Sequence, residues 1–169
     1  MRSKVKIAFL VIALAFVCHG CGIYSFTGAS IPPEAKTVSV AYFPNHAQLV
    51  NPLLSNDFSS ALRDAVMNQT PLEMIEAGGD LAFEGEITDY RTSPVAITAA
   101  QTAAMNRLTI TVKVRFSNRF DETKDFEQSF SQYEDYPSDQ DLNAVQENLT
   151  ATIIEALVED IFNKALVNW

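Results

Sequence analysis

The sequence has few of the residue types on which most enzymes depend. Its 169 residues include two cysteines, Cys18 and Cys21, and two histidines, His19 and His46. Three of these four residues lie near the N-terminus, inside the first 21 positions. Catalysis by a Cys–His pair needs both residue types in one folded site, and a zinc centre needs several histidines or thiolates. The sequence therefore predicts neither a catalytic site nor a metal or other cofactor.

The remaining catalytic patterns are also weak or missing. Gly78 and Gly79 are typical of a turn between strands, and no glycine-rich phosphate loop is present. His46 follows Pro44 in a segment rich in asparagine and proline, which indicates an exposed loop histidine. Acidic residues are plentiful, but no spacing singles out one pair. A hydrolase that uses a carboxylate pair on glycans stays open as an alternative function.

The N-terminus has the pattern of a bacterial lipoprotein signal peptide. Three basic residues in the first six positions precede the uninterrupted apolar run Ile7–Val17, and Gly20 stands before Cys21. A span across a bilayer needs about 20 apolar residues, roughly twice the length of this run. We therefore predict a cleaved signal peptide at residues 1–20, lipidation of Cys21, and a lipidated tether at residues 21–36. The alternative is an ordinary secreted protein.

Lipidation would also determine where the protein resides. Several acyl chains hold a protein at a membrane firmly, whereas one chain binds only marginally. Gly22 occupies the position where an aspartate usually retains a lipoprotein in the inner membrane, and no acidic run follows Cys21. We therefore expect a protein anchored by lipid in the outer membrane, on its periplasmic side.

Positive charge is scarce beyond the predicted cleavage site. The 149 residues that would remain carry nine lysines and arginines against 21 acidic residues. A chain this acidic is a poor partner for the phosphate backbone of a nucleic acid. Its length suits one domain, which we place at residues 37–169.

Alternation of apolar and polar residues predicts strands at residues 37–43, 80–93, 108–120 and 125–134, and a further short strand at 72–75 is open. The polar turn at 121–124 makes the last two long strands antiparallel neighbours.

Helical periodicity predicts a helix at residues 56–69, capped by Ser55 or Asn56, and a long final helix that begins at Ser138. Asp139 and Asp141 would lie in the first turn of the long helix, where its dipole favours acids. The order strand, helix, strands, long helix predicts an α+β two-layer sandwich. Its mostly antiparallel sheet has about four strands and is packed by two helices.

The predicted middle strands hold most of the few basic residues. One interpretation is a site for an anionic ligand, such as phosphate on a glycolipid, which arginine binds in a bidentate way. The other interpretation is cross-strand ion pairing of Lys113 and Arg115 with Glu84 and Glu86. The candidates for ligand binding are Arg91, Arg107, Lys113 and Arg115.

Arg91 and Arg107 are the stronger candidates among the four because they flank the uncharged segment 94–106, outside the regular alternation. This segment is predicted either as a loop that inserts into a partner or contacts lipid, or as an extension of a β-hairpin.

The segment Cys21-Gly-Ile-Tyr-Ser-Phe-Thr-Gly-Ala-Ser-Ile31 resembles the mature N-terminus of the lipopolysaccharide-assembly lipoproteins, the LptE-type family. The predicted order of elements from Thr37 to Trp169 is similar to the fold of that family. The resemblance implies an outer-membrane lipoprotein without enzymatic activity that plugs an LptD-type β-barrel, assists its assembly and binds lipopolysaccharide. Because family members meet the glycolipid with basic residues at strand ends, it also implies that role for Arg91 and Arg107. A general adaptor in barrel assembly or envelope structure is a further alternative.

Overall fold

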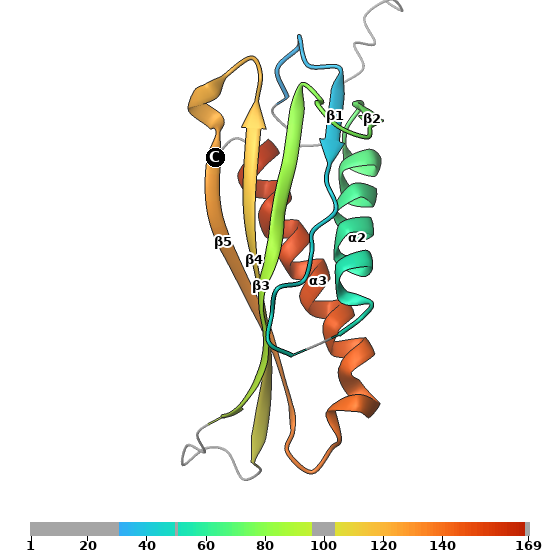
Figure 1. Ribbon diagram of the computed structural model, residues 1–169, viewed down its shortest axis with the longest axis vertical. Coiled ribbons are helices and arrows are strands. Elements are labelled where there is room, and N and C mark those ends of the chain that lie inside the picture. The colour runs from blue at the N-terminus through green and yellow to red at the C-terminus, as the bar shows by residue number, and fades with distance from the viewer. Residues whose placement is uncertain (1–30, 50, 96–103, 168–169) are drawn as a thin grey trace, which may run out of the picture.

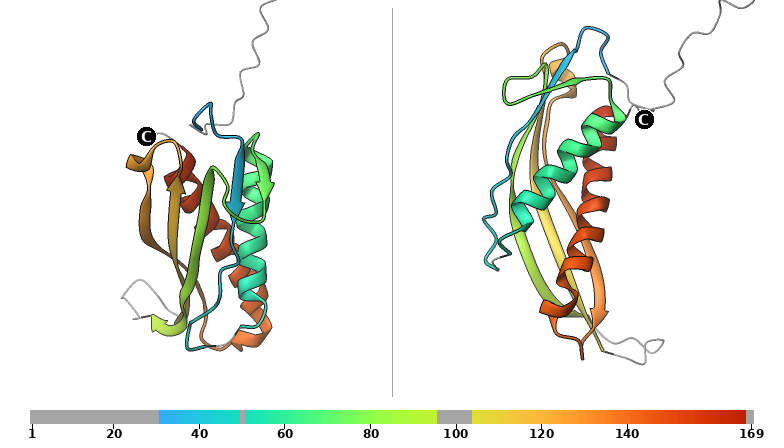
Figure 2. Two further views of the ribbon diagram at one scale, coloured as in Figure 1. Left: turned by 45° about the horizontal axis from the view of Figure 1, so that its top comes forward. Right: turned by 90° about the vertical axis from the view of Figure 1, so that its right-hand side faces the viewer.

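Five strands and two long helices pack as two layers in the computed structural model, which describes residues 31–49, 51–95 and 104–167 (Figure 1). The elements in chain order are β1 (Thr37–Val40), α2 (Leu54–Gln69), β2 (Glu73–Ile75), β3 (Leu81–Val95), β4 (Met105–Asn118), the 3-10 turn η1 (Glu122–Lys124), β5 (Phe126–Pro137) and α3 (Leu142–Leu166). Both helices cover the same face of the sheet, and within the described ranges the opposite face carries no helix (Figure 2). The predicted two-layer α+β sandwich is confirmed.

The strand order in the sheet is β2-β1-β3-β4-β5. β1 pairs in parallel with both β2 and β3, whereas β3, β4 and β5 form two antiparallel pairs. The sheet is therefore mostly antiparallel, as predicted, and its fifth strand is the short segment that the sequence left open. In the described residues no helix is both long enough and apolar enough to cross a membrane.

A long hairpin of β3 and β4 dominates the sheet. Its pairing runs continuously from Leu81 opposite Asn118 to Val95 opposite Met105, with one irregularity between Ile87 and Asp89. This irregularity is a β-bulge, in which one extra residue shifts the side-chain alternation of the strand. Beyond it, the even-numbered Tyr90 is the residue that is buried.

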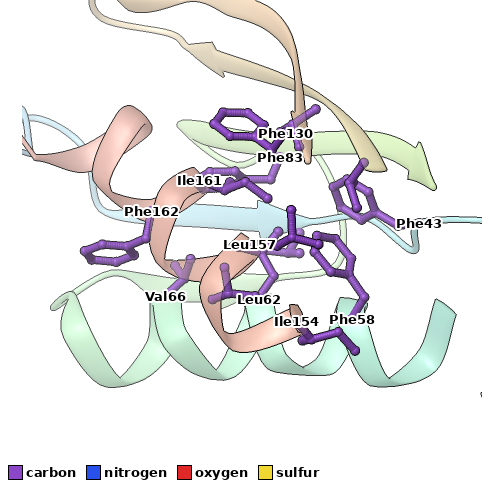
Figure 3. Packing of buried hydrophobic residues seen from close by; sticks show 14 of the residues in the cluster. Phe43, Phe58, Leu62, Val66, Phe83, Phe130, Ile154, Leu157, Ile161 and Phe162 are labelled. Atoms are coloured by element: carbon purple, nitrogen blue, oxygen red, sulfur yellow. The ribbon is translucent and has the colours of Figure 1, made fainter. Parts of the chain in front are cut away.

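The core lies between the sheet and the two helices (Figure 3). Phe43 and Phe58 meet edge to face with ring centroids 5.1 Å apart, and Phe83 lies 4.9 Å from Phe116. The alternate apolar residues of β4 are fully buried, in agreement with the alternation that predicted this strand; they are Leu108, Ile110, Val112, Val114 and Phe116. Burial of aromatic and branched side chains on this scale is what holds the two layers together.

The start of the long helix differs from the prediction. α3 begins at Leu142, and Asp141 caps it by accepting a hydrogen bond from the backbone N–H of Asn143 at 3.0 Å. Ser138 lies outside the helix, because its backbone N–H donates to the carbonyl of Ala104 at 3.1 Å and ties the turn after β5 to the start of β4. The expected first turn with Asp139 and Asp141 is therefore wrong.

The first helix and first strand also need correction. α2 begins at Leu54, and its N-cap residue, Leu53, makes no side-chain capping bond, so neither predicted cap residue acts as one. β1 ends at Val40, short of the predicted strand 37–43, and Tyr42 is 56% exposed. Phe43 takes the inward place, and its backbone N–H donates to the hydroxyl of Ser59 at 3.0 Å.

Asp80 ties the segment before β1 to the sheet. Its carboxylate accepts the backbone N–H groups of Lys36 and Thr37 at 3.0 and 3.1 Å, and also the Thr37 hydroxyl. The hydrogen bond from the Lys36 backbone, followed by that from Thr37, holds the pKa of Asp80 below its ordinary value. The chain therefore enters the domain at a fixed point, beside the turn that joins β4 to β5 (Figure 1).

Candidate functional site

The four predicted basic residues all lie on the helix-free side of the sheet. We call this surface the polar face and define it by the outward-pointing rows of three strands. Its residues are Glu84, Glu86, Asp89 and Arg91 on β3, Arg107, Thr109, Thr111, Lys113 and Arg115 on β4, and Glu127, Ser129, Ser131, Tyr133 and Asp135 on β5. Successive residues of a strand point to opposite sides, so one row of β4 alone supplies three of the four basic side chains.

The position of Arg91 depends on the bulge in β3. An unbroken alternation that places Leu81, Phe83 and Ile87 inward would also place Arg91 inward. The bulge reverses the alternation, so that Tyr90 is buried at 3% exposure and Arg91 lies opposite Thr109 on the polar face. A single extra residue thus moves an arginine from the core side to the outer surface.

The sequence placed Arg91 and Arg107 outside the regular alternation, and this expectation is wrong. β3 continues to Val95 and β4 begins at Met105, so both arginines lie within paired strands. Segment 94–106 is therefore a hairpin extension at its two ends, and its centre, residues 96–103, lies outside the described residues. The hydrogen-bonded pairing between β3 and β4 therefore continues past both arginines.

Arg107 is held by the best-formed ion pair of the polar face. Its Nε and terminal nitrogen donate to the two carboxylate oxygens of Asp135 at 2.7 and 2.9 Å. Its guanidinium carbon also lies 3.6 Å from the ring centroid of Tyr133. The Asp135 hydrogen bond raises the pKa of Arg107, and the same bond lowers the pKa of Asp135.

Of the cross-strand ion pairs that the sequence indicated with Glu84 and Glu86, the described structure shows Arg115 with Glu84, whereas Lys113 pairs with Glu127 on β5. Arg115 lies 3.2 Å from Glu127 and 3.7 Å from Glu84. Hydrogen bonds from Lys113 first, and then from Arg115, hold the pKa of Glu127 below its ordinary value. Glu127, which the sequence did not single out, therefore joins the two cations.

A shallow hollow of about 290 Å³ opens beside these two cations. Its lining residues are Pro44, Glu84, Gly85, Glu86, Lys113, Arg115 and Glu127. Two cations and three carboxylates thus share one small space, and Glu86 also lies 3.6 Å from His46. The hollow could hold a small anionic group only if that group displaced a carboxylate from a cation.

Every predicted basic residue of the polar face has an acidic partner, since Arg91 pairs with Asp89. The side chains of Arg91 and Arg115 are 58% and 62% exposed, whereas that of Arg107 is 33% exposed. An exposed ion pair in water contributes little and exchanges easily. Arg91 and Arg115 are therefore the cations that an incoming anion reaches at least cost.

In the part of the chain that the structure describes, the carboxyl groups do not have the pKa shifts that acid catalysis needs. The three carboxyl groups with clearly changed pKa values, Asp80, Glu127 and Asp135, are all shifted downward. A general acid near neutral pH needs the opposite shift. His46 is exposed and faces Glu86, and no cluster of metal-ligating side chains occurs in the described ranges. Cys21 lies outside those ranges.

The fold is shared with several solved structures at low sequence identity. A minor lipoprotein from Acinetobacter baumannii superposes with a TM-score of 0.52 at 13% identity, over 80% of this chain and 97% of that one. The hypothetical protein CT253 from Chlamydia trachomatis gives 0.52 at 10% identity, over 77% of this chain and 95% of that one. A putative neuraminyllactose-binding hemagglutinin homologue from Helicobacter pylori gives 0.52 at 7% identity, covering 80% and 86%.

At these identities the likenesses show the two-layer α+β fold alone. Residues 35–165 match the model of one family, LptE, described as lipopolysaccharide-assembly. The match covers most of the chain, and the protein belongs to this family. None of the curated proteins matches the chain.

Proposed function

We propose that this protein is an outer-membrane lipoprotein, anchored through Cys21 on the periplasmic side, that plugs an LptD-type barrel and assists its assembly. The observation that carries the proposal is the family match over residues 35–165. A plug must be compact and must present polar surface to a polar lumen. The two-layer domain and its helix-free polar face suit that requirement. On this proposal the protein has no enzymatic activity.

Partner recovery tests the plug role. Affinity-tagged protein extracted from outer membranes in mild detergent is expected to bring down a β-barrel protein in a fixed ratio. Cys21→Ser should lose acylation, detected by mass spectrometry of the N-terminus, and should leave the membrane fraction. Cys18→Ser is the matched control, because the same change inside the predicted signal peptide leaves the acylated cysteine in place. Recovery of monomer alone from intact outer membranes would refute the plug role.

We further propose that lipopolysaccharide contacts the polar face through Arg91, Arg107, Lys113 and Arg115. Support comes from the exposed arginines and the hollow beside Lys113. The carboxylate partners limit affinity, because a phosphate group must compete with them for each cation. Contact would therefore be transient, which suits a molecule that passes lipid onward.

A charge-matched pair of variants tests the contact. Lys113→Gln with Arg115→Gln removes two positive charges from the polar face, and Lys36→Gln with Arg119→Gln removes two from the end where the chain enters. Co-purification of lipopolysaccharide and its surface level in cells depleted of the native protein are the readouts. The first pair should reduce both readouts and the second should reduce neither. Equal behaviour of the two pairs would count against the polar face as the contact.

A further inference from the structure

A groove of about 930 Å³ runs between α2 and α3, on the side of the molecule away from the polar face. The two helices lie side by side and run in the same direction (Figures 1 and 2). Residues four apart on a helix lie on one face, so the groove is built from three such rows. The wall on α2 is Asp57, Ala61, Ala65 and Gln69; the rim on α3 is Glu147, Ala151, Glu155 and Glu159; the floor is Thr150, Ile154, Val158 and Phe162.

The groove is lined by charge of one sign. Four carboxylates line it, and none of its lining residues is a lysine, arginine or histidine. Within the described ranges these four side chains make no ion pair, although every basic residue of the polar face has an acidic partner. The four residues are Asp57, Glu147, Glu155 and Glu159. The concentration of unpaired negative charge between two helices is unfavourable for the isolated protein and favourable for a cationic occupant.

The floor adds a second, independent observation. Thr150 is 4% exposed, and its hydroxyl is buried without a hydrogen-bond partner in the described structure. A buried hydroxyl without a partner costs free energy that an incoming donor would recover. Lysine and arginine are donors only, so they suit both this hydroxyl and the carboxylates around it.

The spacing of the acids excludes a single metal ion and favours an elongated partner. No three metal-ligating side chains converge in the part of the chain described here. Glu155 and Glu159 are one helical turn apart, about 6 Å along the axis, and Glu147 is about 12 Å before Glu155. Alanines at 61, 65 and 151 leave room for another backbone to come close.

We propose that this groove binds a basic segment of a partner protein, with lysine or arginine side chains spaced along it to meet the three acids of α3 and Asp57 of α2. A second copy of the chain fits poorly, because its helices carry the same acidic row. The surface is separate from the polar face, so one protein can hold a protein segment on its helices while its sheet stays open to a ligand.

A defined peptide probe tests the proposal on the full-length lipidated protein in detergent. The probe is a fluorescent, alanine-based helical peptide whose lysines repeat at the spacing of the three acids on α3, and its twin carries glutamate in place of lysine. Binding is followed by fluorescence anisotropy at low and at high salt. The lysine peptide should bind and weaken as salt rises, and the glutamate twin should not bind.

The groove variant combines Asp57→Asn, Glu147→Gln, Glu155→Gln and Glu159→Gln. Its affinity for the lysine peptide should fall at least about tenfold, as the loss of four exposed ion pairs predicts. The control combines Glu73→Gln, Glu76→Gln, Glu122→Gln and Asp139→Asn, which changes the net charge equally at exposed positions elsewhere. The control should stay within about twofold of wild type, and circular dichroism checks that both variants fold.

Three results would overturn the proposal. Equal losses in the two variants would mean that net charge alone attracts the peptide. Binding of the glutamate twin would remove charge as the cause. Sedimentation that shows wild type dimerising, and the groove variant dimerising more weakly, would assign the groove to a second copy of the chain.

Discussion

Gly85 offers a sharp test of the packing between β3, β4 and the loop that carries Phe43. A methyl group at this position would overlap the backbone carbonyl oxygen of Lys113 and would lie 2.7 Å from Cε1 of Phe43. The first obstacle is backbone and cannot rotate away. We therefore expect Gly85→Ala to push the two strands apart locally.

The expected cost is set by the interactions that this separation weakens. Two strained hydrogen bonds between β3 and β4 account for about 1 kcal/mol each. Displacement of Phe43 from its edge-to-face packing on Phe58 adds roughly 1 kcal/mol. The total of about 3 kcal/mol corresponds to a fall of about 10 °C in the melting temperature for a domain of this size. Urea denaturation and thermal melting, both followed by circular dichroism, measure the two quantities.

Gly78→Ala is the control. Gly78 has a φ of 71°, and among the described residues no atom other than those of its chain neighbours lies within 4 Å of the place where a side chain would start. Its substitution should cost only the backbone penalty, about 1 kcal/mol. A double variant Gly85→Ala with Phe43→Leu should not recover stability, because the overlap with Lys113 remains. A destabilisation by Gly85→Ala no greater than that by Gly78→Ala would refute this account of the strand packing.

Three further predictions concern single polar groups. Asp80→Asn should lower the melting temperature at pH 7, because the carboxylate accepts three hydrogen bonds, and the difference from wild type should narrow near pH 3. Asp135 has a folded pKa below its ordinary value of 3.8, so its stabilising effect is present above that pH and is lost as pH falls through the folded value. Asp135→Asn should therefore reduce the loss of stability that wild type shows as the pH falls. An unchanged loss would mean that the Arg107–Asp135 pair does not cause it. Tyr90→Phe and Thr150→Val should each raise the free energy of unfolding by about 1 kcal/mol, since each removes a buried hydroxyl without a partner in the described structure. Destabilisation by either change would instead indicate that the hydroxyl forms a hydrogen bond to water.

The elements with strong periodicity were predictable from the sequence. The apolar row of β4 from Leu108 to Phe116 alternates without a break, and each member is buried. The long helix was also predictable. Ile154, Val158 and Phe162 repeat every four residues, but their burial depends on α2 packing beside α3, and the repeat does not say which element covers it.

The polar face was only partly predictable. Lys113 and Arg115 belong to a regular strand, and the pairing of Arg115 with Glu84 followed from the alternation, whereas the pairing of both cations with Glu127 did not. Arg91 depended on the bulge at Thr88, for which the one sequence signal is Tyr90, an aromatic residue out of step with Leu81 and Ile87. The link between Arg107 and Asp135 required the register of β4 against β5, which pattern alone does not specify.

The β3–β4 hairpin is longer than the hydrocarbon layer of a membrane is thick. β4 has 14 residues and spans about 48 Å, while the hydrocarbon layer of a bilayer is about 30 Å thick. Ile31 lies beside Leu81 and Asn118 at one end of the hairpin, and Val95 pairs with Met105 at the other end. If acyl chains on Cys21 hold the first end at the inner leaflet, the same rigid hairpin is long enough to bring its far tip level with the outer leaflet. The length of a single pair of strands would then match the distance between the two leaflets.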